Sequence, residues 1–451
     1  GVDCGRPAPG DGQRRSRHTD LLGPPGSGVA SLARSPRRLL ARLLPVALLA
    51  LPLSATANPA ANDLPVEEIQ TFAEVFERIK RAYVEEVDDA TLLRNAMRGM
   101  LSELDPHSAY LDREEFQSLR ESTQGEFGGI GIEVGLEDGQ LMVISPIDDT
   151  PASRAGLQAR DLILRIDDTP TESLSLQEAV NLMRGEPGTR IELTSQRQGE
   201  SSPRTVTLTR EVVRTESVRS ELLEPGYAYL RISQFQSRTA DQVAEQIRRL
   251  ERDGALSGLV LDLRNNPGGV LQAAVGVADA FLESGLIVYT EGRLADTEMQ
   301  FSAGGDTAAP EVPLVVLING GSASAAEIVA GALQDQRRAV VMGTESFGKG
   351  SVQQIMPLGN GEGLKLTTAL YYTPNGRSIQ AQGIEPDVEV VRGRVEVTES
   401  GRQVREADLE GHLRSRDAPR ERSEMSERLR EDYQLGEALN LLKALNVLSR
   451  R

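Results

Sequence analysis

Two serines and one lysine are the side chains of this sequence best placed for covalent chemistry. Ser322 and Ser324 lie in the small-residue stretch 319–331, and Lys349 follows Ser324 by 25 residues, between two glycines. A serine hydroxyl needs a base to become a nucleophile at neutral pH, and a desolvated lysine is one of the few side chains that can serve. The flanking glycines and a short apolar strand favour a packed position that lowers the pKa of Lys349. These residues predict a serine nucleophile activated by a lysine base.

The composition leaves few other candidates for this chemistry. The 451 residues include three histidines, His18, His107 and His412, and a single cysteine, Cys4. Cys4 lies far upstream of any segment that looks folded, which excludes a cysteine nucleophile, a disulfide framework and a cysteine-based zinc site. His107 follows a proline turn, where a histidine more often has a structural role than a catalytic one. We therefore expect a reaction that uses no metal and no cofactor.

The turn that carries Ser324 is predicted to join a buried strand to a helix. Backbone N–H groups at the first turn of a helix are unpaired and can stabilise an oxyanion, so the N–H of Ala325 is one candidate donor. A second glycine-rich loop, 263–269, follows another buried strand, and the N–H of Gly269 is the natural second donor. An ordinary helix N-cap explains a serine at position 324 equally well, and spacing alone does not decide between the two.

Lys349 also completes a near-match to a phosphate-binding loop. Residues 343–349 follow the pattern G-x-x-x-x-G-K, but the next residue is Gly350 instead of serine or threonine. The following segment, 351–356, is β-like and not helical, so no helix N-terminus is available to bind a phosphate. A nucleotide-dependent function is therefore disfavoured.

The charge and the N-terminal sequence indicate an exported, acidic protein. The formal net charge of −17 argues against binding to nucleic acid, and the absence of tryptophan argues against base-stacking platforms. Four arginines between positions 34 and 42 precede an apolar run, 43–53, and Ala55 and Ala57 form a small-x-small cleavage pattern. This is typical of a signal peptide, and we expect the mature protein in the periplasm. The alternative is an uncleaved anchor that keeps the protein at the membrane.

Composition and periodicity divide the chain into five parts, which together indicate a multidomain α/β (α+β) protein. They are upstream sequence with a signal peptide in 1–57, a helical domain in 62–124, a small strand-rich domain in 125–212, a layered α/β core in 213–392, and a charged tail with a terminal helix in 393–451. The region 392–430 is rich in both charges and poor in apolar residues, so we expect it to be mobile.

The core is predicted to alternate strands and helices. Buried strands are expected at 227–232, 258–263 and 313–318, and helices are expected at 239–253 and 325–334. This alternation favours a sheet layered with helices.

The strand-rich domain, 125–212, resembles a PDZ domain in its circularly permuted bacterial form. The resemblance rests on the glycine-rich segment 127–134 and on the segment 155–161, which precedes a strand. Such a domain captures a chain end: backbone N–H groups bind the carboxylate, the peptide adds as a strand, and the helix predicted at 175–184 forms a wall of the groove. The N–H groups in question are those of Gly129, Ile130, Gly131 and Ile132. The alternative is a glycine-rich hairpin without a ligand.

Three segments of the core together resemble the carboxyl-terminal processing proteases, also called tail-specific proteases. They are Leu-Asp-Leu-Arg-Asn-Asn-Pro-Gly-Gly at 261–269, Ser-Ala-Ser-Ala-Ala-Glu-Ile-x-Ala-Gly-Ala-Leu-x-Asp at 322–335, and Phe-Gly-Lys-Gly at 347–350. The resemblance covers nearly the whole mature chain. It implies a PDZ domain inserted before a crotonase-like layered α/β protease core.

The resemblance also implies roles for individual residues. Ser324 would be the nucleophile, Lys349 the general base, and Gln353 the residue that orients the lysine. Glu327, one helical turn after the serine, matches a family position, where it could simply brace the helix. Arg184 matches a family arginine that links the PDZ domain to the active site.

The function implied by the resemblance is that of a periplasmic serine endopeptidase that recognises apolar C-termini of proteins. Neutral Lys349 would take the proton of Ser324, the serine would attack the scissile carbonyl, and water would release the acyl-enzyme. Relatives use adaptor lipoproteins and form dimers or larger rings, so we expect partners of both kinds. The alternative is a PDZ scaffold or adaptor whose protease fold is inactive.

Overall fold

The computed structural model describes residues 64–137, 139–197, 199–200, 202–252, 254–305, 307–394 and 427–449. The chain divides into two units between Ala73 and Glu74, and the described part of the first contains the start of α1 (Val66–Ala82). The predicted signal peptide and nearly all of the charged region 392–430 lie outside the described residues. None of the described helices is long and apolar enough to cross a membrane.

Two further helices and a short strand follow α1. Helices α2 (Asp89–Ser102) and α3 (Arg113–Gln124) each begin at an aspartate whose side chain accepts a backbone N–H of the first turn. Between them lies strand β1 (Ala109–Leu111), which pairs antiparallel with β18 (Gly363–Tyr372) and places Ala109 opposite Lys365. Three residues are too few to show strand alternation, which is why β1 was not predicted.

The strand-rich domain is an antiparallel sheet with two helices packed on it. Its strands are β3 (Ile132–Glu137), β4 (Gln140–Pro146), β5 (Leu162–Ile166), β6 (Thr169–Pro170), β7 (Arg190–Gln196) and β8 (Arg204–Thr209), in the order β3-β4-β5-β7-β8 with β6 beside β5. Helix α4 (Pro151–Arg154) is short, and α5 (Leu176–Met183) begins with a capping box. Strands β2 (Glu126–Gly129) and β9 (Glu211–Arg214) pair where the chain enters and leaves the domain. The strand-rich domain predicted at 125–212 and its helix predicted at 175–184 are confirmed.

The core is built on a six-stranded sheet with the order β10-β11-β12-β15-β16-β19. Its strands are β10 (Val218–Glu224), β11 (Tyr227–Ile232), β12 (Gly258–Asp262), β15 (Leu314–Ile318), β16 (Val340–Gly343) and β19 (Val388–Glu389). Pairing is parallel from β11 to β19, and β10 is antiparallel to β11. The two central strands, β12 and β15, are buried at every position, as expected for a parallel sheet covered on both faces.

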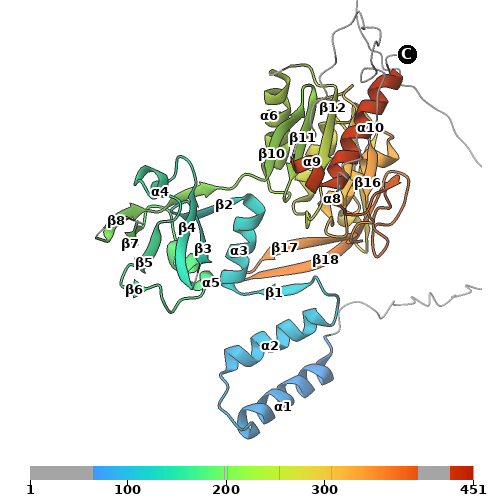
Figure 1. Cartoon of the computed structure of the whole chain (residues 1–451). Helices are drawn as coiled ribbons and strands as arrows, with labels where there is room; N and C mark the ends of the chain where they lie inside the picture. Colours follow the sequence, from blue (N-terminus) through green and yellow to red (C-terminus); the bar gives the residue numbers. More distant parts are fainter. Residues whose placement is uncertain are drawn as a thin grey trace, which may run out of the picture. The chain divides into compact units, whose positions relative to one another are not determined.

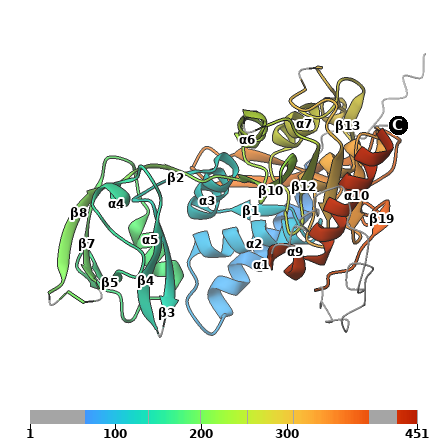
Figure 2. The ribbon, with the colours of Figure 1, turned by 45° about the horizontal axis from the view of Figure 1, so that its top comes forward.

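Helices cover both faces of this sheet (Figures 1 and 2). On one face of the sheet, Leu261 and the other side chains that point to that face pack against three helices. These are α6 (Thr239–Arg252), α7 (Leu271–Asp279) and α8 (Ala325–Asp335). Val260, on the opposite pleat, packs against α10 (Tyr433–Ser449), which follows the short α9 (Glu427–Glu431). The α/β class expected from the sequence is thus confirmed. Helix α7 was not predicted, because its small apolar residues are buried on several sides and show no single apolar stripe.

A second, antiparallel sheet carries the residues that follow Lys349. Its strands run in the order β1-β18-β13-β14, with β17 also paired to β18. The new strands are β13 (Leu286–Gly292), β14 (Gln300–Ser302) and β17 (Ser351–Pro357), and the 3₁₀ turn η1 (Ala295–Thr297) lies between β13 and β14. Strand β17 confirms that the residues after the near-match to a phosphate loop do not form a helix.

The terminal helices are joined to the core by a buried ion-pair network around Arg264. The Arg264 guanidinium donates to Asp262 at 2.7 and 2.9 Å and to Asp432 at 2.7 and 2.8 Å. Asp262 is fully buried, and Arg264 is the second residue of the glycine-rich loop 263–269. The C-terminal segment therefore supports the start of this loop.

An Asp432→Asn variant is expected to lower the melting temperature of the core by several degrees. Removing one partner of a buried charged pair costs about 1–3 kcal/mol, and each kcal/mol corresponds to about 2–4 °C in a domain of this size. Burial raises the pKa of Asp432, but hydrogen bonds from Arg264 outweigh it and hold that pKa below its ordinary value. A carboxylate with a lowered pKa stabilises the fold above its unfolded pKa, so the difference should shrink as pH falls through the folded pKa. Thermal unfolding at several pH values measures the loss in melting temperature and its dependence on pH, with a Glu431→Gln change at an exposed position as the control. An Asp432→Asn variant with the Tm of wild type would contradict the expectation.

Candidate active site

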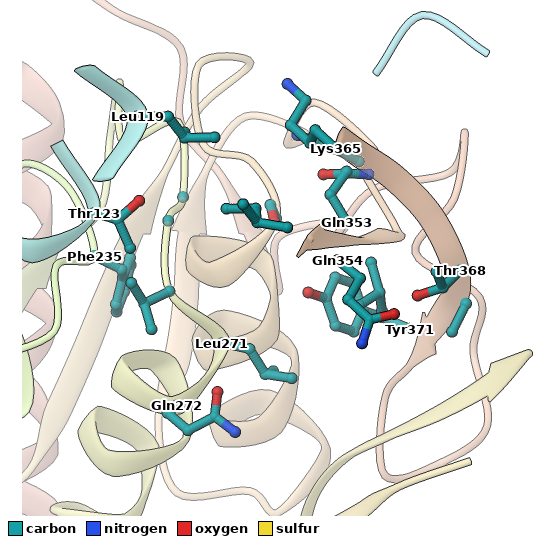
Figure 3. A pocket seen from close by; sticks show the side chains of 18 of the residues that line it. Leu119, Thr123, Phe235, Leu271, Gln272, Gln353, Gln354, Lys365, Thr368 and Tyr371 are labelled. Carbon is teal, nitrogen blue, oxygen red and sulfur yellow. The ribbon is translucent and has the colours of Figure 1, made fainter. Parts of the chain in front are cut away.

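Ser324, Lys349 and Gln353 come from three segments of the core and line one cavity of about 640 Å³. Figure 3 shows Phe235, Leu271 and Gln272 on one side of this cavity, and Gln353, Gln354 and Tyr371 on the other. The glycine-rich loop lines it as well, through Pro267, Gly268 and Gly269. The structure thus brings together the serine, the lysine, the glutamine and one of the two predicted oxyanion donors.

Ser324 lies at the N-cap position of α8, and only 7% of it is exposed. Its φ of 53° and ψ of −112° are unusual for a residue with a side chain, whereas an ordinary N-cap has extended backbone. Strain of this kind persists only where surrounding contacts enforce it, and it is concentrated at functional sites. The N-cap interpretation is right about position, but it does not account for this backbone. Ser322, by contrast, is fully buried and donates to Leu263 O at 2.8 Å, which makes it a turn residue.

Glu327 connects the turn of Ser324 to the turn of Lys349. One carboxylate oxygen accepts the N–H of Ser324 at 2.6 Å and the N–H of Lys349 at 2.9 Å. The other accepts Ser346 Oγ and the N–H of Gly348, both at 2.6 Å. Glu327 is fully buried, and burial raises its pKa while these four hydrogen bonds oppose the shift. The residue therefore does more than brace its own helix, because it fixes two loops to one carboxylate.

Lys349 occupies the packed position that its flanking residues predict. Burial lowers the pKa of Lys349, the positive charge of Lys365 lowers it further, and the carboxylates of Asp105 and Glu327 oppose the shift. Within the described part of the chain, its amine makes no ion pair. A half-buried amine with a lowered pKa has a larger neutral fraction at neutral pH, which a general base requires.

Gln353 lies on β17, at a register shift that separates it from Val352. Its amide nitrogen donates to Ser351 Oγ at 2.9 Å and, at 3.5 Å, to Thr367 Oγ1 on β18. Gln353 and Lys349 line the same cavity. The role of Gln353 in orienting that lysine stays a prediction.

The glycine-rich loop approaches Ser324 so closely that a side chain would not fit. A Cβ on Gly268, whose φ is +96°, would lie 2.8 Å from Ser324 Cβ and 3.0 Å from Ala325 N. The loop is held by Asn266, fully buried, which accepts the N–H of Gly268 and donates to Ile232 O, both at 2.9 Å. The N–H groups of Gly269 and Ala325 donate to no acceptor within the described residues. They are therefore available to an incoming oxyanion, as the sequence predicts for this pair.

Tyr371 is a member of the site that the sequence did not indicate. It lies on β18, lines the cavity and is 4% exposed. Burial raises the pKa of Tyr371 to about 12, and a hydrogen bond with Ser324 opposes the shift. An aromatic residue in an alternating strand is usually a core residue, so its type and position carried no functional signal.

The four residues predicted to bind a carboxylate line a second, smaller pocket in the PDZ-like domain. This pocket has a volume of about 90 Å³, and its other lining residues are Phe127, Val134, Val180, Met183 and Arg184. The carbonyl of Ile130 accepts the N–H of Ala152, and that of Gly131 accepts Thr150 Oγ1, at 2.9 and 3.1 Å. The backbone N–H groups of Ile130 and Gly131 donate to no acceptor among the described residues, so they can donate to a bound ligand. Helix α5 contributes Val180 and Met183, as expected of the groove wall.

Arg184 lies at the edge of this second pocket. Its Nη1 donates to Glu121 Oε2 at 3.3 Å, and its guanidinium stacks over the Phe127 ring at 4.8 Å. Glu121 is on α3, and Leu119 and Thr123 of the same helix line the first cavity. A physical connection thus runs from the second pocket to the wall of the candidate active site.

Comparison with known proteins gives matches along most of the chain. Residues 226–390 match Peptidase family S41, residues 142–197 match a PDZ domain, and residues 51–115 match the Activating protease CtpB N-terminal domain. A Carboxy-terminal-processing protease of Bartonella bacilliformis is 44% identical over 409 residues, which are 89% of this chain and 93% of that protein. Carboxy-terminal processing protease CtpB of Bacillus subtilis is 37% identical over 347 residues, or 76% of this chain and 71% of that protein. The solved structure of a photosystem II D1 C-terminal processing protease, 32% identical, covers 72% of this chain and 93% of its own, with a TM-score of 0.43.

Proposed function

The chain belongs to the carboxy-terminal-processing proteases, and we propose that it is a serine endopeptidase in which Ser324 and Lys349 cleave proteins delivered by the PDZ domain. The observation that carries this proposal is the shared cavity: the strained Ser324, the desolvated Lys349 and Gly269, one of the two proposed oxyanion donors, line the same space, and Ala325, the other, directly follows Ser324. A nucleophile, a base and oxyanion donors are the groups that acyl transfer requires.

The reaction proceeds through an acyl-enzyme. The neutral amine of Lys349 takes the proton of Ser324, and the serine oxygen attacks the carbonyl carbon of the scissile peptide. The resulting oxyanion accepts hydrogen bonds from the N–H groups of Gly269 and Ala325. The lysine ammonium then protonates the leaving amine, water attacks the ester, and Ser324 recovers its proton. Because only neutral Lys349 can act as base, activity rises as pH rises through its lowered pKa.

The substrate is held by an apolar chain end. Its carboxylate binds the N–H groups of the loop from Gly129 to Ile132, and its last side chain enters the pocket lined by Val180 and Met183. Arg184 transmits occupancy of this pocket through Glu121 to α3, which lines the active-site cavity. The PDZ domain thereby both selects the substrate and gates the protease.

A reporter protein with an exchangeable tail tests this function. We expect cleavage when the tail ends in apolar residues, and kcat/KM at least about tenfold lower when the last residues are aspartates or the terminal carboxylate is amidated. Cleavage that is equal for all three tails would contradict selection by the PDZ domain. Tail binding without any cleavage would instead identify a PDZ adaptor with an inactive protease fold.

We also propose that the protein is exported to the periplasm after removal of its signal peptide, and that it works there with an adaptor lipoprotein and as an oligomer. The support for self-association is α1, where Ile69, Phe72 and Val75 are 49%, 48% and 50% exposed along one apolar face. N-terminal sequencing and sizing of the protein recovered from the periplasm test location, cleavage and assembly.

A further inference from the structure

We propose that Asp105, in the loop between α2 and β1, is a positioning residue for the Ser–Lys reaction. It acts through Thr367 on Gln353, and its charge acts on Lys349. This inference rests on the proposed function and assigns part of the catalytic apparatus to the helical N-terminal segment.

Asp105 first organises its own loop. Oδ1 accepts the backbone N–H groups of His107 and Ser108 at 2.8 and 2.9 Å, and Oδ2 accepts Ser108 Oγ at 2.6 Å. These bonds close a turn at Pro106, directly before β1 begins. The carboxylate is partly buried and Ser108 is 6% exposed, so the turn is a fixed part of the fold.

The loop closed by Asp105 also binds β18 at Thr367, past the last residue of β18 that pairs with β1. The register of β1 with β18 ends where Ala109 faces Lys365. Further along, the N–H of Thr367 donates to Ser108 Oγ, and Thr367 Oγ1 donates to Asp105 Oδ1, both at 3.1 Å. Side chains of the loop thus replace the missing strand partner, at a point 262 residues from Asp105 in the chain.

Thr367 is also the register partner of Gln353 in the pairing of β17 with β18. The amide nitrogen of Gln353 donates to Thr367 Oγ1 at 3.5 Å. A hydroxyl has one proton to donate, and the Asp105 carboxylate takes it, so the lone pairs of Thr367 are left for the amide nitrogen. Together with the carbonyl of Ser351, which accepts the same amide nitrogen at 3.2 Å, this series of hydrogen bonds turns the amide nitrogen toward Thr367. The amide oxygen of Gln353 accepts no hydrogen bond from the described residues and can therefore accept one from an amine.

Four charged or titratable groups face Lys349 from the elements around it. They are Asp105 from the loop before β1, His107 from the same loop, Glu327 from α8 and Lys365 from β18. Burial and the charges of Lys349 and Lys365 lower the pKa of His107, and the carboxylate of Asp105 opposes the shift. The two carboxylates raise the pKa of Lys349, and Lys365 lowers it. Removing the charge of Asp105 should therefore lower the pKa of Lys349, and removing Lys365 should raise it.

The test is the pH profile of kcat/KM on the apolar-tailed reporter for Asp105→Asn, Thr367→Val and Lys365→Met. We expect Asp105→Asn to lower the plateau about tenfold and to move the acid limb to lower pH. Lys365→Met should move that limb to higher pH, and Thr367→Val should lower the plateau without moving the limb. Asp112→Asn, the same change at the N-cap of α3, should do neither.

A merely structural role would change the plateau but not the position of the acid limb. An Asp105→Asn variant whose acid limb stays at the wild-type pH would overturn the inference, whatever its plateau. If that variant does not fold, a wild-type plateau in Thr367→Val would overturn it as well. A Ser324→Ala variant that cleaves like wild type would instead refute the proposed function, so the two failures are distinguishable.

Discussion

A Lys349→Met variant is expected to lose about a thousandfold in kcat/KM on the tailed reporter and to unfold at a higher temperature than wild type. Methionine has nearly the same length but cannot accept the serine proton, and loss of a general base typically costs about 10²–10⁴ in rate. The same substitution removes an amine that burial disfavours in its charged form, as the lowered pKa of Lys349 shows. Steady-state kinetics and thermal unfolding of the same preparation measure the two effects.

Ser324→Ala and the double variant test whether Ser324 and Lys349 act in the same step. If the two residues act as one unit, combining Ser324→Ala with Lys349→Met should lower activity no further than either change alone. Lys365→Met is the control at the high-pH plateau of kcat/KM, because Lys365 lines the same cavity and shifts the acid limb but has no role as base. A Lys349→Met variant that keeps more than about a tenth of wild-type activity would show that another group takes the proton.

The parts of the core that were predictable are those with local signals. Strand β11 and strand β12 are mostly apolar, and their observed bounds agree with the predicted ones to within one residue. Helix α8 follows a small-residue turn and was placed correctly with Ser324 at its start. Helix α7 and strand β13 were missed, because their burial is decided by neighbours distant in the chain.

The same division holds within the candidate site. Ser324 and Lys349 were identifiable because a reactive residue type lies in an unusual local setting of glycines and small residues. Tyr371 and Asp105 have ordinary local settings, and only the antiparallel pairing of β18 with β17 and β1 brings Tyr371 to the cavity and Asp105 to Thr367. Pairing of this kind is set by contacts far apart in sequence, which a single sequence does not reveal.

Glu327 was identified from its local sequence position, but its contacts with residues distant in the sequence appear only in the structure. It was visible as a family position one turn after Ser324, yet only the structure shows that the turn of Lys349, 22 residues away, depends on the same carboxylate. An acceptor-only side chain is suited to this place, because all four groups that point at it are donors. Serine and lysine are therefore held in register by one carboxylate that accepts the backbone N–H groups of both.

A Glu327→Ala variant is consequently expected to lose about a hundredfold or more in kcat and about 3–5 kcal/mol in stability. The change leaves a hydroxyl and three backbone N–H groups unpaired in a buried site, and each unpaired group costs about 1–3 kcal/mol. Glu327→Gln preserves the volume but points an NH₂ group at donors, so it should fall between alanine and wild type. Exposed Glu345→Gln is the matched control. Denaturant unfolding and single-turnover cleavage measure both effects; a stable Glu327→Ala enzyme with wild-type kcat would mean that Ser324 and Lys349 keep their geometry without this carboxylate.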